Sequence, residues 1–259
     1  MGESLSSVRN AVRVLKAFSS RRRDYGVTEL ARALGMTTST VHRLLRTLQS
    51  EHLVEQDPET GRYRLGLAVY DLVAASSPGY DLSEAVLPPM TMLRNRTGET
   101  TQLAVLDGRE VVYVERLQSM HSLRMFLDVG RRNWAHSTST GKVLLAHLEP
   151  SVLDRTLEGW EPPSRTPFTV TDLAVLRRQL AQIRHQGWAH NVDESEIGAT
   201  SIGAPVRDVS GQVVAALSVV GPSPRMDQDL AAIRQAVVEA AAVASRRLGH
   251  RGRGVDHAS

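Results

Sequence analysis

The first fifty residues carry apolar side chains at helical spacing in three successive segments. The first helix is expected to begin near Ser7, with one apolar face made of Val8, Val12, Leu15 and Phe18. A polar loop over residues 19–26 separates it from a short second helix, which we expect to end at Gly35. Thr37 is suited to cap a third helix that runs to about Ser50.

After Leu53 the apolar period drops to two, which predicts a β-hairpin closed by a turn over residues 57–61. In its second strand, Arg62 and Arg64 alternate with Tyr63 and Leu65, which we expect to point inward. Residues 66–76 then predict a linking helix. The sequence Pro78-Gly79 ends it and marks a candidate boundary between a small first domain and a larger second one.

The remaining residues mix hairpins and helices, which predicts an α+β fold. The expected strands lie at residues 101–106, 110–117, 122–129, 201–207 and 212–220. The expected helices lie at residues 82–97, 139–148, 151–158, 171–186 and 227–248. The domain division that follows is 1–66 for a helical head with a hairpin, 67–79 for a linker helix, 80–250 for a mixed α/β body and 251–259 for a flexible tail.

Composition narrows the functional classes. The 259 residues include no cysteine, which excludes disulfides, thiolate catalysis, iron–sulfur clusters and cysteine zinc sites. Residues 1–67 contain 11 Lys and Arg against 7 Asp and Glu, a net charge of +4, whereas the other 192 residues carry 20 against 21, or −1. This asymmetry favours a basic head that meets a polyanion. With no secretory signal and no run of roughly 20 apolar residues, we expect a soluble, cytoplasmic protein.

The third predicted helix has two faces. Val41, Leu44, Leu45 and Leu48 form an apolar stripe that would dock the helix on its own domain. The opposite side carries hydrogen-bond donors suited to bases and phosphates in a major groove. The candidate groove contacts are Thr38, Ser39, Thr40, His42, Arg43 and Arg46, with Arg62 and Arg64 of the hairpin on phosphates or in the minor groove. The simpler alternative is a solvated polar face that binds nothing.

The segment VTELARALGMTTSTVHRLLRTLQSEHLVEQDPETGRYRLG closely resembles the winged helix-turn-helix of IclR-type bacterial transcriptional regulators. The resemblance continues through LAVLDGREVVYVERL, AHSTSTGKVLLAHL and SIGAPVRDVSGQVVAALSVVGP, in family order, and covers about residues 5–248. It implies an N-terminal winged helix joined by a linker helix to a GAF-like effector-binding domain. It also implies a homodimer or homotetramer on operator DNA, more often a repressor, that responds to a small organic or aromatic acid.

A candidate effector pocket follows in two ways. Residues 137–141 (STSTG) precede a helix, where backbone N–H groups favour a carboxylate. The family resemblance implies effector contacts at Ser139, Thr140, Gly141, Asn191, Ser201, Ser218 and Val220. Asn191, Ser201 and Val220 stand where the family often has Asp, Cys and Ser, which argues against the smallest polar effectors. Trp134, with Met125 and Phe126, suggests a larger or aromatic acid; the alternative is that all three are core residues.

Enzyme motifs are weak. Ser139-Thr140-Gly141-Lys142 matches S-x-x-K, but no partner motif follows, and His136 stands where a phosphate-binding loop needs its first glycine. The acidic and histidine side chains at residues 185–196 fit no standard metal spacing. The sequence therefore predicts no catalytic residue, cofactor or metal. The alternative function is a small-molecule-binding or metabolic protein whose helix-turn-helix serves assembly only.

Overall fold

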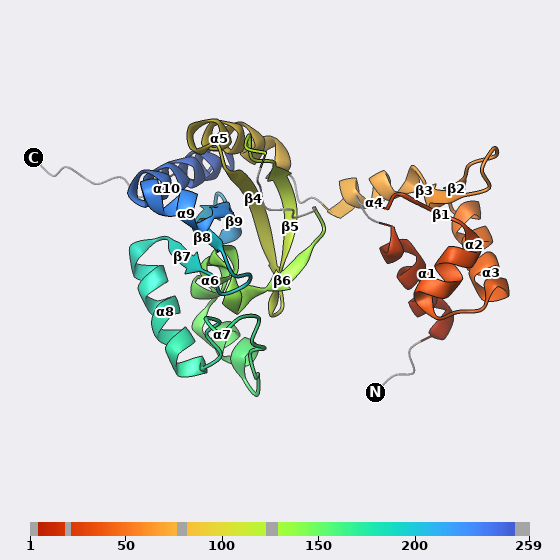
Figure 1. Cartoon of the computed structure of the whole chain (residues 1–259), viewed down its shortest axis with the longest axis horizontal. Helices are drawn as coiled ribbons and strands as arrows, with labels where there is room; N and C mark the ends of the chain where they lie inside the picture. Colours follow the sequence, from red (N-terminus) through yellow and green to blue (C-terminus); the bar gives the residue numbers. More distant parts are fainter. Residues whose placement is uncertain (1–4, 19–21, 77–81, 123–128, 252–259) are drawn as a thin grey trace, which may run out of the picture. The chain divides into compact units, whose positions relative to one another are not determined.

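The computed structural model describes residues 5–18, 22–76, 82–122 and 129–251. The chain divides into two compact units, Met1–Gly79 and Tyr80–Ser259 (Figure 1). Most of the strand expected at residues 122–129 lies outside the described residues, as do Met125, Phe126 and the tail from residue 252.

The first unit has the predicted three helices and hairpin. Its helices are α1 (Ser6–Ala17), α2 (Val27–Leu34), α3 (Thr38–Ser50) and α4 (Ala68–Ser76). Its strands β1 (Asp24–Tyr25), β2 (Val54–Gln56) and β3 (Tyr63–Leu65) form an antiparallel sheet in the order β1-β3-β2. The two-residue strand β1 falls in the segment expected to be a loop, and it pairs Asp24 with Arg64 and Tyr25 with Tyr63.

Helix ends in this unit follow local chemistry. Gly35 takes a left-handed conformation, φ +65°, and ends α2 as expected. The Thr37 hydroxyl accepts the Thr40 N–H at 3.3 Å and caps α3. These two caps set the sharp turn between α2 and α3, which is the geometry of a helix-turn-helix.

Packing corrects two sequence expectations. Val8 and Val12 are 57% and 41% exposed, because the buried face of α1 centres on Val14, with Phe18 beyond it. In the hairpin Tyr63 is buried, but Leu65 is 39% exposed. The core of this unit joins α1, α2 and α3 to the hairpin; its buried apolar members are Val14, Phe18, Leu30, Ala31, Val41, Leu45, Leu48, Val54 and Tyr63.

The second unit is built on an antiparallel sheet in the order β6-β5-β4-β9-β8-β7. Its strands are β4 (Thr100–Asp107), β5 (Glu110–Leu117), β6 (Arg132–Trp134), β7 (Ala189–Val192), β8 (Ala199–Arg207) and β9 (Val213–Pro222). Its helical segments are α5 (Leu82–Thr97), η1 (Ala135–Ser137), α6 (Ser139–Ala146), α7 (Pro150–Leu157), α8 (Leu173–Gln186), α9 (Ser223–Met226), η2 (Asp227–Asp229) and α10 (Leu230–Arg247).

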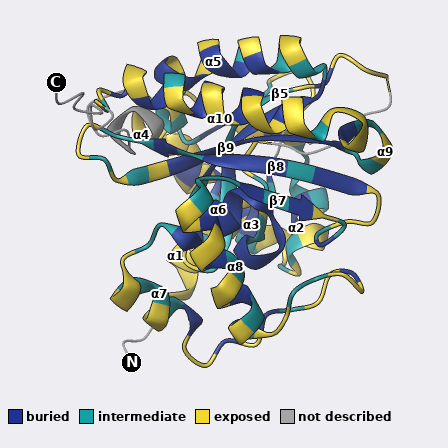
Figure 2. Cartoon of the chain, turned by 90° about the vertical axis from the view of Figure 1, so that its left-hand side faces the viewer, coloured by how far each residue is buried: buried dark blue, intermediate teal, exposed yellow. Residues whose placement is uncertain are grey.

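Helices cover both faces of this sheet, so its central strands are buried (Figure 2). One hydrophobic core lies between the sheet and the pair α5 and α10, and a second lies between the sheet and the pair α6 and α8. The mixed α+β class expected from the sequence is confirmed. Polar side chains on the face beneath α6 are exceptions in a buried sheet, and they mark the candidate site.

None of the described helices is long and apolar enough to span a membrane.

Candidate DNA-binding face and effector pocket

Helix α3 presents the predicted polar side chains on its outer face. Val41, Leu45 and Leu48 are buried against the other helices of the unit. The side chains of Thr38, Ser39, His42, Arg43 and Arg46 are exposed, and Thr40 is half-buried beside the cap. Within the described residues no hydrogen bond or ion pair holds the guanidinium of Arg43 or Arg46. Both are therefore available to an incoming nucleic acid.

The two hairpin arginines are held differently. Arg62 donates to Asp24 at 2.7 Å and to Glu29 at 2.8 Å, which ties the hairpin to β1 and to the first turn of α2. Arg64 is more exposed and donates to Glu55 of the neighbouring strand at 2.5 Å. Among the described residues Arg62 pairs with two carboxylates and Arg64 with one, so either arginine would have to release a carboxylate to bind phosphate.

The register of three neighbouring strands brings together the first residues of the pocket in the second unit. Ser201 on β8 pairs directly with Val220 on β9, and Gln102 on β4 pairs with Ser218 on β9. Side chains two residues apart on a strand share a face, so Ser218 and Val220 project to the same side of the sheet. The register therefore gathers these four side chains into one polar area of the face that α6 covers.

Helix α6 approaches this area because two glycines permit it. A Cβ atom at Gly203 would lie 3.1 Å from the backbone of Ser139, so the first turn of α6 rests on β8 at a position without a side chain. A Cβ atom at Gly141 would collide with the backbone of Ala135. Thr138 caps the helix, its hydroxyl accepting the Gly141 N–H at 3.1 Å. Close packing thus places Ser139 at the pocket wall.

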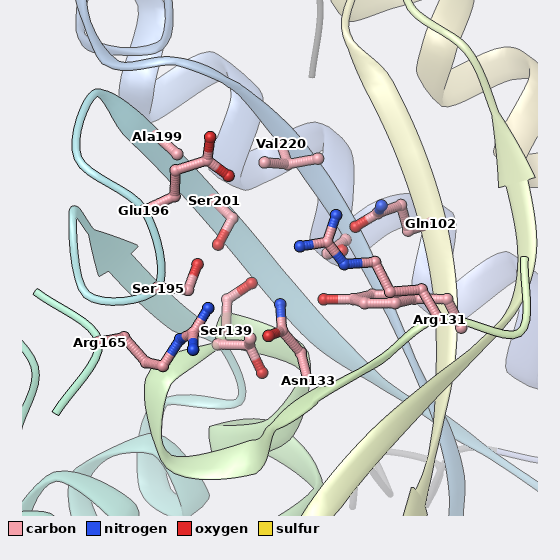
Figure 3. A pocket seen from close by; sticks show the side chains of 13 residues that line it. Gln102, Arg131, Asn133, Ser139, Arg165, Ser195, Glu196, Ala199, Ser201 and Val220 are labelled. Atoms are coloured by element: carbon pink, nitrogen blue, oxygen red, sulfur yellow. The ribbon is translucent and has the colours of Figure 1, made fainter. Parts of the chain in front are cut away.

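Loops complete the wall and enclose a cavity of about 120 Å³. Figure 3 shows the guanidinium groups of Arg131 and Arg165 entering from opposite sides, with Ser139, Asn133 and Ser201 between them. Glu196 lies at the rim, near Ala199. The lining residues are Gln102, Tyr113, Arg131, Asn133, Thr138, Ser139, Arg165, Ser195, Glu196, Ala199, Ser201, Ser218 and Val220.

Several of these lining groups are buried. Burial raises the pKa of Tyr113, against the opposing effect of neighbouring Thr140 and Asn133 side chains, so its phenol is neutral at physiological pH. The Nε2 of Gln102 is buried and has no hydrogen-bond partner within the described residues. An unpartnered buried amide at a cavity wall is a costly feature that a polar ligand would relieve.

The predicted effector contacts divide into two groups. Ser139, Ser201, Ser218 and Val220 line this pocket. Thr140, Gly141, Asn191 and Trp134 lie outside its lining.

The residues of the second group have neighbours of their own. Thr140 and Gly141 are buried in the first turn of α6. The Asn191 side chain donates to the carbonyl of Ser137 at 3.0 Å, which fixes the segment before α6 rather than facing the cavity. The Trp134 ring is half-buried and packs against the Trp160 ring, with 6.1 Å between the ring centroids.

Sequence reasoning missed most of the loop and edge residues of the pocket. Polar residues at 100–102, in a strand that is otherwise apolar, were a usable signal for Gln102. The sequence carries no signal for Arg131 or Arg165. Arg131 directly precedes the short strand β6 and Arg165 lies in an irregular loop, and the positions of both depend on the whole fold.

The alternative chemistries find no support in the described residues. No three His, Asp or Glu side chains gather there as a metal site would require. Lys142, the lysine of the S-x-x-K match, is buried and pairs with Glu194, so its ammonium is neutralised by a carboxylate rather than directed at Ser139.

A helix-turn-helix with a hairpin wing is the DNA-binding motif of many transcriptional regulators, and here a second domain with a polar pocket follows it. Family models agree with both parts. Residues 7–58 match the IclR helix-turn-helix domain, and residues 75–246 match the C-terminal domain of the bacterial transcriptional regulator IclR. The chain belongs to the IclR family of transcriptional regulators, as its sequence motifs indicated.

Individual relatives cover about four fifths or more of the chain. The HTH-type transcriptional regulator XynR of Escherichia coli is 35% identical over 95% of this chain and 98% of its own. The transcriptional repressor AllR of Escherichia coli is 32% identical over 78% of this chain and 75% of its own. An IclR homologue of Microbacterium hydrocarbonoxydans, solved in complex with 4-hydroxybenzoate, matches with a TM-score of 0.82 and 32% identity, over 94% of this chain and 99% of that chain.

Proposed function

We propose that this regulator is a repressor that binds operator DNA as a dimer or dimer of dimers and responds to a small organic acid in the pocket beneath α6. DNA binding is assigned to residues 1–66, linkage to 67–79 and effector binding to 80–250. Because its partner is operator DNA, its place of action is the bacterial cytoplasm.

The observation that carries the proposal is the outer face of α3. Arg43 and Arg46 project beside Ser39 and His42 with no acidic partner in the described part of the chain. A base-reading helix needs such donors, since Arg pairs with guanine through two parallel hydrogen bonds. Thr38 and Thr40 at the helix start, and Arg64 and Arg62 on the wing, would add contacts to phosphate.

Self-association is supported by apolar side chains at the linker. Leu67, Tyr70 and Leu72 are 74%, 73% and 59% exposed. Leu67 directly precedes α4, and Tyr70 and Leu72 lie on it. Exposed apolar residues gathered in this way are typical of a surface that another chain covers. Two copies joined at the linker would present two reading helices, which suits a palindromic or repeated operator.

An acid as effector is supported by the charge of the pocket. Two guanidinium groups and a helix start face the cavity against one carboxylate, Glu196. The 4-hydroxybenzoate complex of the Microbacterium homologue shows that a relative accepts an acid. Contacts at Ser139, Ser201 and Ser218 would supply hydroxyls for the remaining oxygens of the ligand.

The test is selection of fragments of the source organism's genomic DNA by the purified protein, followed by footprinting of the recovered site. The proposal expects a protected palindrome or paired half-sites. Affinity for it should fall steeply between 50 and 200 mM salt, by about a thousandfold or more if six or more phosphates are contacted. Recovery of no site above background, with and without added acids, would favour the alternative in which the helix-turn-helix only mediates assembly.

A further inference from the structure

The two arginines of the pocket enter it from opposite sides. Figure 3 shows Arg131 on the side of β5 and Arg165 on the side of Ser195, with both guanidinium groups directed into the space between them. A single carboxylate can bind one guanidinium through two parallel hydrogen bonds. Two guanidiniums on opposite walls instead match a ligand with an anionic group at each end.

Both arginines are carried on fixed backbone. The backbone carbonyl of Arg131 accepts the Tyr113 N–H at 3.1 Å, which holds it against β5. The backbone N–H of Arg165 donates to the Thr169 hydroxyl at 3.0 Å, and Thr169 in turn donates to the Glu194 carbonyl at 2.7 Å. Within the described residues no carboxylate pairs with Arg165. Its charge is therefore presented to the cavity from an ordered loop rather than neutralised.

The middle of the pocket is polar. Ser139, Ser201 and Ser218 line it, and the buried Nε2 of Gln102 has no hydrogen-bond partner among the described residues. Apolar contact comes only from a small part of the lining, Ala199, Val220 and the Tyr113 ring. Such a wall favours a ligand whose centre carries hydroxyl or keto oxygens over a hydrocarbon chain.

Size limits the ligand as well. The cavity measures about 120 Å³. A cavity of about 150 Å³ accommodates benzene, so this one suits a skeleton of roughly four to six carbon atoms.

We propose that the effector is a short hydroxy- or oxo-dicarboxylate, with one carboxylate on Arg131 and the other on Arg165. This rests on the proposed function and names the class of acid at the same pocket. Ser201, Ser218 and Gln102 bind the central oxygens. Glu196, at the exposed rim, repels a ligand that carries a further negative charge.

The test is calorimetric titration of the full-length protein with two matched pairs of acids. L-malate is compared with 2-hydroxybutyrate, and 2-oxoglutarate with 2-oxopentanoate; each pair differs by one terminal carboxylate. The wild type is compared with Arg165→Gln and Arg131→Gln. Arg177→Gln is the control, because Arg177 lies on α8 and pairs with Asp154 away from the pocket lining. Circular dichroism checks that all variants fold.

At least one dicarboxylate should bind the wild type and Arg177→Gln about tenfold or more tightly than its monocarboxylate partner, since a charge-assisted hydrogen bond contributes at least that factor. In Arg165→Gln and in Arg131→Gln the members of that pair should bind within about threefold of each other. Two results overturn the proposal of a dicarboxylate but leave the proposed function standing. One is equal binding of both members of each pair by the wild type; the other is a preference for the dicarboxylate that survives in both pocket variants. Binding of none of the four acids to the wild type also overturns the dicarboxylate, whereas the proposed function is tested separately by the selection of operator DNA.

Discussion

Lys142 of α6 and Glu194 of the loop after β7 form an ion pair inside the effector unit, with side chains 2% and 10% exposed. Lys142 also donates to Gln179 of α8 at 2.9 Å, and Glu194 accepts the Val170 N–H at 3.4 Å. Burial lowers the pKa of Lys142, and the charge of Glu194 opposes that shift. The pair thus joins α6, α8 and the two loops that carry the pocket residues Arg165 and Ser195.

Removal of the carboxylate should therefore destabilise the effector unit. Glu194→Gln leaves a buried ammonium without its counter-charge, and we expect a loss of about 3–5 kcal/mol in the free energy of unfolding. Urea unfolding followed by tryptophan emission measures it selectively, because the chain's three tryptophans, 134, 160 and 188, all lie in this unit. Asp154→Asn, which breaks the exposed pair with Arg177, is the control and should cost less than about 1 kcal/mol.

A double variant separates charge from packing. Lys142→Met combined with Glu194→Gln removes both charges and should recover part of the stability lost in Glu194→Gln. If the double variant is less stable than Glu194→Gln, the buried ammonium is not the source of the loss.

His136, in the turn before α6, gives the effector unit a pH dependence. Its ring is buried against Trp160, and burial lowers its pKa from 6.5 to about 4. Between these values the unfolded chain binds a proton that the folded chain does not. The contribution of His136 to stability is fully present above pH 6.5 and falls by up to about 1.4 kcal/mol per pH unit toward pH 4.

Urea unfolding at pH 7.5, 6.0 and 5.0 measures this dependence. Burial also lowers the pKa of His147 and His190, so these residues add to the slope with the same sign. In His136→Gln the free energy of unfolding should still fall with decreasing pH, but less steeply, because only His147 and His190 then contribute. An unchanged slope in the variant would show that His136 titrates normally in the folded protein.

Gly141 is expected to tolerate no side chain. An Ala in a helix is ordinarily more stable than Gly by about 0.5–1 kcal/mol, but here a Cβ would collide with Ala135. Gly141→Ala should therefore destabilise the unit by about 1–3 kcal/mol and weaken acid binding, since Ser139 would be displaced. Ser151→Ala on the exposed start of α7 should change neither quantity. A neutral or stabilising Gly141→Ala would mean that the first turn of α6 has room to move.

Much of the fold could be predicted from periodicity alone. The helix-turn-helix, its caps and the long strands appear in the sequence because each depends on neighbouring residues: Gly35 and Thr37 act within one turn of the chain. The strands β6 and β7, of three and four residues, are too short to give a pattern. The buried face of α1 was misplaced because tertiary packing on α3, not the helix's own spacing, selects Val14.

Most of the pocket residues that could be predicted were supplied by the family resemblance; the residues themselves pointed only to the helix start at 137–141 and to the polar positions at 100–102. Ser139, Ser201, Ser218 and Val220 come together through strand register and the approach of α6 to Gly203. These are relationships between residues tens of positions apart, which spacing does not reveal. Arg165 reaches the cavity from a loop between α7 and α8 whose path is set by Thr166, Thr169 and Glu194.

Two arginines of the DNA-binding unit should differ in role. If Arg43 of α3 reads bases as proposed, Arg43→Ala should cost about 1–3 kcal/mol on the recovered operator and relax specificity at one position. If Arg64 of the wing binds phosphate as proposed, Arg64→Ala should weaken operator and random DNA alike and lower the salt slope by about one. Fluorescence anisotropy on both DNAs at several salt concentrations measures this. Identical behaviour of the two variants would contradict the division of roles.

The central claim is that a small acid held beneath α6 controls operator binding. The most direct measurement is the operator Kd of the full-length protein, with and without a saturating concentration of the acid that binds most tightly in calorimetry. We predict that the acid changes the operator Kd of the wild type by about fivefold or more. In the double variant Ser139→Ala/Ser201→Ala the operator Kd without acid should equal that of the wild type, and the acid should not change it. An operator Kd that is the same with the acid bound as without it would contradict the account.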